Sequence, residues 1–100
     1  MIEGFHRYPD APSYCSYLSA RHRHIFNIRC WWNVSHNYRE LEINHVQNII
    51  ADDIKKNFGS PAKFKGMSCE DICEYLLNLY PQVEKVEVTE DGYGGASFTR

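Results

Sequence analysis

Three histidines have a spacing that allows one metal ion to bind all of them: His6 near the start of the chain, and the pair His22 and His24. Strand residues two positions apart project to the same side, with Cα atoms roughly 6.5–7 Å apart. With a third imidazole from a neighbouring antiparallel strand, they make three neutral ligands and one open position, as in catalytic zinc sites. The alternative is a set of ordinary strand histidines, partly buried and hydrogen-bonded. With His6 on the inner face of the adjacent predicted strand, the pattern favours Zn²⁺.

Glu90 is the candidate residue for holding a ligand. It ends an alternating segment and shares one face with Val86 and Val88. From the local sequence, a turn residue at the rim of the sheet is the favoured interpretation. The alternative is an anchor, whose carboxylate would accept two N–H groups from the amidine-like edge of a flat heterocycle.

The candidates for proton transfer or nucleophilic attack are less clearly marked. Cys15 precedes the histidine pair and would be a thiolate near a metal, although an ordinary loop thiol is the favoured interpretation. His36 and His45 are candidate bases by residue type alone. Cys69 and Cys73 lie four positions apart, which places them on one face of a helix, and core packing is favoured there over a metal clip. The sequence has no Ser-His-Asp, phosphate-loop or paired-carboxylate pattern.

The elements that position these residues follow from hydrophobic periodicity. The even-numbered residues of the 22–34 segment form its more apolar face, so His22 and His24 are expected to point to the interior. Ser68 begins a capping-box pattern before an apolar run, which predicts a helix start. The predicted elements are strands over 2–8, 22–34, 83–90 and 96–99, and helices over 43–57 and 69–80. The predicted connections are loops over 14–21 and 60–66, a polar turn over 33–39 and a glycine-rich turn over 91–95. The order ββααββ predicts an α+β fold, an antiparallel sheet with two helices on one face.

Length and charge narrow the class of protein. The chain has 100 residues, which predicts a single domain over 1–100, with a core small enough to benefit from a metal or a partner subunit. A formal net charge of −2 gives no basic field for a nucleic-acid backbone. The apolar runs are too short to span a membrane. The N-terminal residues lack the pattern of a signal peptide, so we expect a cytoplasmic protein with reduced thiols.

Taken together, these residues resemble the 6-pyruvoyl-tetrahydropterin synthase and 6-carboxytetrahydropterin synthase family, which has the tunnelling fold. Members typically carry Phe-x-Ala-x-His on the first strand, Cys-x-x-x-His-Gly-His on the second, Pro-Thr-x-Glu at a helix start, and Val-x-Val-x-Glu at the end of a late strand. The matching segments of this chain, in the same order, are Phe5-His6, His22-Arg23-His24, Ser68-Cys69-Glu70 and Val86-Glu87-Val88-Thr89-Glu90.

The resemblance implies a metal centre and a ligand pocket. The three histidines would hold zinc, and Glu90 would anchor the pyrimidine edge of a pterin- or purine-like small molecule. The helix start with Ser68, Cys69 and Glu70 would shape the pocket, with its backbone N–H groups facing the ligand. Family members assemble as trimers, often stacked to hexamers, and closing their strands into a barrel removes exposed sheet edges. We therefore expect a homo-oligomer.

The chain departs from the family at its proton-transfer groups. Leu18 occupies the place of the family's catalytic cysteine, Arg23 replaces the glycine between two ligands, and the 59–67 segment has no Asp-His pair. Three functions stay open: a zinc-dependent lyase of the synthase type that uses Cys15, His45 or His36; a non-catalytic oligomer that binds a pterin or purine nucleotide; and an interaction domain with buried histidines and no metal.

Overall fold

The computed structural model describes residues 1–36, 38 and 40–100. Its elements are β1 (Ile2–His6), the 3-10 helix η1 (Ser13–Ser19), β2 (His22–Trp32), α1 (Ile43–Phe58), β3 (Ala62–Lys65), α2 (Cys69–Leu79), β4 (Val83–Glu90) and β5 (Gly94–Thr99). The predicted α+β class is confirmed. The predicted polar turn over 33–39 falls partly on residues 37 and 39, which lie outside the described residues. None of the described helices is long and apolar enough to cross a membrane.

The strands form one mixed sheet in the order β3-β1-β2-β4-β5. The pairs β1/β2, β2/β4 and β4/β5 are antiparallel, as predicted, whereas β3 runs parallel to β1. The prediction of a wholly antiparallel sheet, with a loop over 60–66, is therefore wrong at β3. Ala62 and Phe64 of this strand are buried and the two lysines between and after them are exposed. Four residues are too few for this alternation to stand out from a loop.

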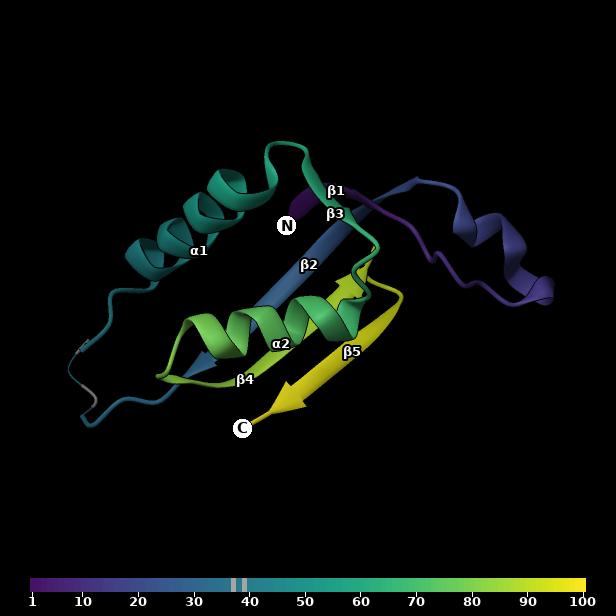
Figure 1. The fold of residues 1–100 in the computed structure, drawn as a ribbon. Helices are drawn as coiled ribbons and strands as arrows, with labels where there is room; N and C mark the ends of the chain where they lie inside the picture. Colours follow the sequence, from purple (N-terminus) through teal and green to yellow (C-terminus); the bar gives the residue numbers. More distant parts are fainter. Residues whose placement is uncertain (37, 39) are drawn as a thin grey trace.

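The core lies between the sheet and the two α-helices, and α2 lies across the sheet face (Figure 1). The largest fully buried side chains are Phe26, Phe64, Ile54, Ile72, Leu76, Val83, Val86, Val88 and Cys73. They come from both helices and from β2, β3 and β4, so a single core joins every layer. Cys69 and Cys73 are both buried in it, which confirms core packing for this pair.

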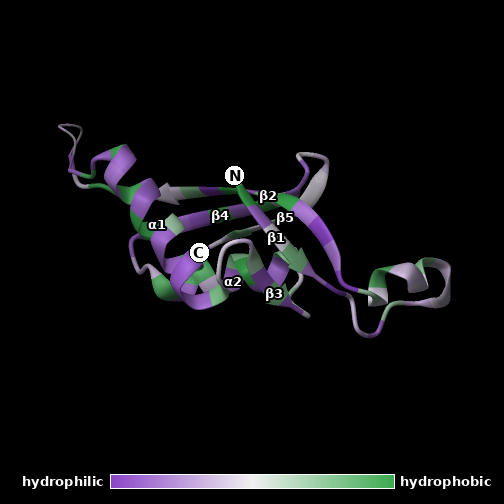
Figure 2. Cartoon of the chain, turned by 90° about the horizontal axis from the view of Figure 1, so that it is seen from above, coloured by the Kyte–Doolittle hydropathy of each residue, from purple (hydrophilic) through white to green (hydrophobic). Residues whose placement is uncertain are grey.

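The end of the molecule around η1 stands apart from this core. In Figures 1 and 2 the η1 segment extends away from the sheet, and the molecule measures 51 × 25 × 22 Å. Tyr14 and Tyr17 of this segment are 84% and 75% exposed. Much of the loop predicted over 14–21 is thus helical, and it presents aromatic side chains to solvent.

Gly95 is the point at which β5 approaches β4 most closely. A Cβ atom at this position would lie 1.8 Å from the Val88 carbonyl oxygen and 2.6 Å from Thr89 Cα. Because both contacts are with backbone, the two strands must separate to admit a methyl group. We expect Gly95→Ala to lower the free energy of unfolding by about 3 kcal/mol, at the upper end for overpacking. Urea unfolding measures this loss.

Gly94→Ala is the matched control for this prediction. A Cβ atom at Gly94 would meet nothing within 4 Å, although the residue lies next to Gly95 on the same strand. Equal urea midpoints for the two variants would contradict the close approach of β4 and β5.

Candidate metal centre

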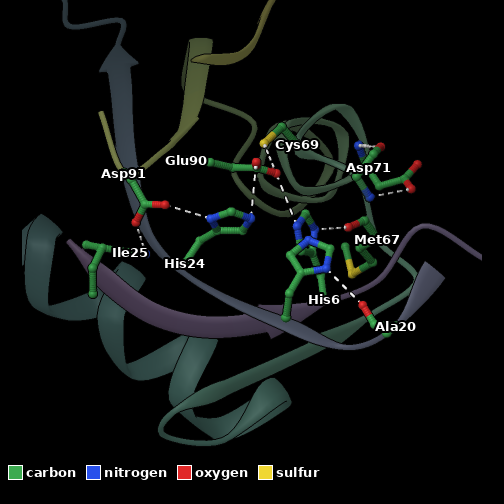
Figure 3. A network of polar contacts seen from close by, with 11 residues as sticks. His6, Ala20, His24, Ile25, Met67, Cys69, Asp71, Glu90 and Asp91 are labelled. Carbon is green, nitrogen blue, oxygen red and sulfur yellow. Dashed lines mark hydrogen bonds and ion pairs between the residues drawn. The ribbon is translucent and has the colours of Figure 1, made fainter. Parts of the chain in front are cut away.

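The three predicted histidines meet on the helix-covered face of the sheet. His6 and His22 are directly opposite each other in the β1/β2 register, and His24 follows two residues along on the same side. The ring centroid of His6 lies 4.5 Å from that of His22 and 5.2 Å from that of His24. One nitrogen from each ring can be chosen so that all three lie within 4.8 Å of one another. The predicted cluster is therefore present (Figure 3).

Each imidazole places its Nδ1 atom against an oxygen acceptor. These contacts are His6 Nδ1 to the Met67 carbonyl at 3.0 Å, His22 Nδ1 to the Ala20 carbonyl at 2.9 Å, and His24 Nδ1 to Asp91 Oδ2 at 2.7 Å. Because carbonyl and carboxylate oxygens only accept, each Nδ1 carries the hydrogen and, in the neutral ring, Nε2 keeps a lone pair. Metal-ligating histidines are oriented by outer partners of this kind.

The Nε2 atoms of His6 and His24 have no hydrogen-bond partner among the described residues, and both atoms are buried. A buried unsatisfied polar atom costs about 1–3 kcal/mol. Burial lowers the pKa of His6, against the Met67 carbonyl and the Glu90 carboxylate, which raise it. A neutral ring with a free lone pair is the form that binds a metal. These residues could therefore hold a metal ion, and a bound ion would satisfy the orphaned nitrogens.

Two neighbouring elements fix the positions of these rings. The ring of Phe26 lies beneath His6 and His24 in edge-to-face contacts, with centroids 5.2 Å and 5.8 Å away. The parallel pairing of β3 with β1 brings the β3–α2 connection, and with it the Met67 carbonyl, beside His6. The unpredicted strand β3 therefore helps to build the centre.

Asp91 is a site residue that the sequence indicated only as part of a turn. Its φ angle is 54°, a left-handed conformation that aspartate and asparagine tolerate better than most residues. Oδ1 accepts from the Ile25 amide at 2.8 Å, and the Asp91 amide donates to the Ile25 carbonyl at 2.7 Å. The Ile25 amide and then His24 lower the pKa of this carboxyl. Oδ2 is thereby fixed as the acceptor for His24.

Asp91→Asn tests this positioning role. Asparagine keeps the size of the side chain, and its oxygen can still accept from Ile25, but its amide then presents a donor to the donor Nδ1 of His24. We expect zinc affinity to fall by about tenfold, at the lower end for outer partners of metal ligands. Competition with a chromophoric chelator measures it. Asp10→Asn, at an exposed residue of the same pocket, should leave the affinity unchanged, and an equal loss in both variants would refute the role.

A cavity of about 820 Å³ opens over the histidines. Its lining includes all four residues predicted to contact a ligand: Ser68, Cys69, Glu70 and Glu90. The predicted capping box is present, since Ser68 Oγ accepts from the Asp71 amide and Asp71 Oδ2 accepts from the Ser68 amide. This box fixes the start of α2 at the cavity wall. The structure thus brings the predicted metal ligands and the predicted ligand contacts into one pocket.

The residues suggested for proton transfer lie elsewhere. Cys15 is buried within η1, and His45 is exposed on the first turn of α1; neither lines the cavity, nor does His36. The thiol that does line it is Cys69, whose Sγ lies 3.6 Å from Glu90 Oε1. Burial, followed by the nearby Glu90, raises the pKa of Cys69 to about 12, so this group stays a protonated thiol.

The chemistry of this site rests on its own residues. No protein-family model and no curated protein matches this chain. Three imidazole nitrogens at one end of a cavity can hold a Lewis-acidic metal ion, which polarises a carbonyl or hydroxyl group of a bound molecule. The carboxylates of Glu90 and Asp91 supply the negative charge next to the cluster.

Proposed function

We propose that this chain is a zinc protein of the tetrahydropterin synthase type, which binds a pterin- or purine-like molecule over a metal held by His6, His22 and His24. The observation that carries the proposal is the convergence of three imidazoles whose Nδ1 atoms are all engaged by oxygen acceptors. An interaction domain without a metal is supported less well, because the buried Nε2 atoms of His6 and His24 would then need protons to pair with the Glu90 carboxylate.

The donor set supports zinc over other cations. Neutral imidazole suits Zn²⁺ and neighbouring transition metals, whereas Mg²⁺ and Ca²⁺ prefer oxygen ligands. Cys69 is the only cysteine that lines the cavity within the described residues, and its high pKa keeps it from being a ready thiolate ligand. Three histidines leave a coordination position for a further group, as in catalytic zinc sites.

The cavity supports a small, flat, polar ligand. Its volume of about 820 Å³ lies within the range of roughly 300–1,000 Å³ for small-molecule pockets. Tyr8 and Tyr93 at its rim are exposed aromatic rings on which a heterocycle can stack. Glu90 can accept N–H groups of an amidine-like edge, and the N-terminus of α2 favours a negative group on the ligand.

The location of the proton-transfer candidates favours a second function, that of a non-catalytic binding protein. A synthase needs groups that move protons at the ligand, and neither Cys15 nor His45 lines the cavity. A binding protein needs only the metal, the carboxylate and the cavity. Incubation of the zinc-loaded protein with dihydroneopterin triphosphate separates the two functions. Product formation that is lost on zinc removal supports the synthase, and tight binding without turnover supports the carrier or sensor.

Native mass spectrometry of the purified protein tests the shared core of both functions. We expect about one zinc per chain, because sites of this kind bind tightly. We also expect either a trimer or a hexamer made of two stacked trimers. The oligomer is part of the proposal because β3 and β5 are edge strands whose free sides closure would cover. Less than about a tenth of an equivalent of zinc in chelator-free protein would refute the metal centre.

A further inference from the structure

Glu90 reaches the histidine cluster from the end of β4. In the β2/β4 register it lies opposite Phe26, whose ring supports His6 and His24. Its carboxylate reaches the imidazoles of His6 and His24 (Figure 3). Glu90 Oε1 lies 3.1 Å from His6 Nε2, and Oε2 lies 3.3 Å from His24 Nε2. One carboxylate thus faces both orphaned nitrogens.

Both contacts join atoms that carry lone pairs. The Nδ1 hydrogens of His6 and His24 are already directed at the Met67 carbonyl and at Asp91. The Nε2 atoms of the neutral rings are therefore acceptors, and an ionised carboxylate is also only an acceptor. Acceptors at 3.1 Å and 3.3 Å repel one another unless a positive charge, a proton or a metal ion, lies between them. A metal ion shared by the carboxylate and the two rings satisfies all three groups at once.

The separations also match those of ligands on one metal ion. Two ligands of a tetrahedral zinc, each bonded at about 2.0–2.1 Å, lie roughly 3.3 Å apart. The Cys69 thiol donates to Glu90 Oε1 across 3.6 Å, and ligating carboxylates are commonly held by an outer hydrogen bond of this kind. The two separations therefore fit a carboxylate that shares one metal ion with both histidines.

We propose that Glu90 is a fourth protein ligand of the metal when the cavity holds no small molecule. The centre is then closed by three histidines and one carboxylate. This inference rests on the proposed function, because it needs a metal at the histidines. It deepens that function, since a molecule that binds through Glu90 must first displace the carboxylate from the metal. Ligand entry is thus coupled to a change in the metal's coordination.

The first test compares zinc affinity in Glu90→Gln with that in Asp10→Asn. Both variants remove one negative charge from the cavity lining, but Asp10 is exposed ahead of η1. We expect Glu90→Gln to weaken zinc binding by about 100-fold or more, because about 100-fold is the upper end for the loss of an outer partner of a metal ligand, and Asp10→Asn to match the wild type. Competition with a chromophoric chelator gives the dissociation constants, and circular dichroism verifies that both variants fold.

The second test asks whether the metal has an open position, using protein loaded with Co²⁺ and the neutral ligand imidazole. Because imidazole carries no charge, repulsion by Glu90 does not affect its binding. We expect its addition to leave the visible Co²⁺ spectrum of the wild type unchanged and to alter that of Glu90→Gln. If the wild-type spectrum changes as readily as that of the variant, Glu90 is not a ligand. If the wild type binds neither Zn²⁺ nor Co²⁺, the proposed function itself fails.

Discussion

Replacing His22 by alanine is expected to lower the zinc affinity of this protein by between about 100-fold and about 1,000-fold. Metal binding at structural zinc sites is worth about 10–16 kcal/mol in total, so each of four ligands accounts for roughly 2.5–4 kcal/mol. His22 is the best of the three histidines to remove. Its ring is only half-buried and contacts a local carbonyl, that of Ala20, so the fold depends on it least.

His45→Ala is the matched control, because it removes an exposed histidine of α1 that lies outside the cavity. Zinc binding by both variants is measured by isothermal titration calorimetry or by chelator competition. We expect wild-type affinity for His45→Ala. A dissociation constant for His22→Ala within threefold of that of the wild type would show that the three imidazoles do not act as one centre.

The histidine cluster was predictable from the sequence because its geometry is almost entirely local. Alternation along 22–34 places His22 and His24 on one face, and the adjacent antiparallel strand sets His6 opposite His22. The start of α2 was equally predictable, since the capping box lies within the four residues from Ser68 to Asp71. Patterns that lie within one element, or between two consecutive strands, can be recognised from the sequence without knowledge of the tertiary structure.

The partners that orient the histidines were not predictable, because each depends on long-range pairing. The Met67 carbonyl reaches His6 only because β3 docks in parallel on β1, and a four-residue strand gives no sequence signal for that partner. Asp91 reaches His24 through the β2/β4 register, across 67 positions of the chain. Within the sequence it was one residue of a glycine-rich turn. The register of distant strands, rather than residue type, decides these roles.

The same dependence on strand register explains why the role assigned to Glu90 from the sequence differs from the role that the structure suggests. Alternation along β4 correctly places it on the face of Val86 and Val88, but this pattern gives no information about what lies opposite. Opposite it lies Phe26, and beyond that ring lie the two unsatisfied imidazoles. The sequence indicates a carboxylate at the rim of the sheet or an anchor for a ligand ring, whereas the structure makes Glu90 a candidate ligand of the metal.

Phe26→Ala is expected to lower the free energy of unfolding by about 3–5 kcal/mol, the usual loss for a phenylalanine deleted from a core. Phe26 is 0% exposed, and its ring packs edge-to-face on Phe64 as well as on His6 and His24. Its removal opens a void between the core and the metal centre, into which the imidazoles can tilt. Zinc affinity should therefore fall together with stability, which chelator competition and urea unfolding measure on the same samples.

Two further variants separate packing under the histidines from general damage to the sheet. Phe5→Ala removes a half-buried ring from the opposite side of β1, where it contacts Arg21, and it should cost less stability and leave zinc affinity unchanged. Phe26→Leu fills most of the void and should cost less than about 1.5 kcal/mol. If Phe26→Leu and Phe5→Ala weaken zinc binding equally, Phe26 has no specific role beneath the centre. If only the Phe26 variants weaken zinc binding, the hydrophobic core and the metal centre form one cooperative unit. In that unit the packing around β2 fixes the orientation of the histidine ligands.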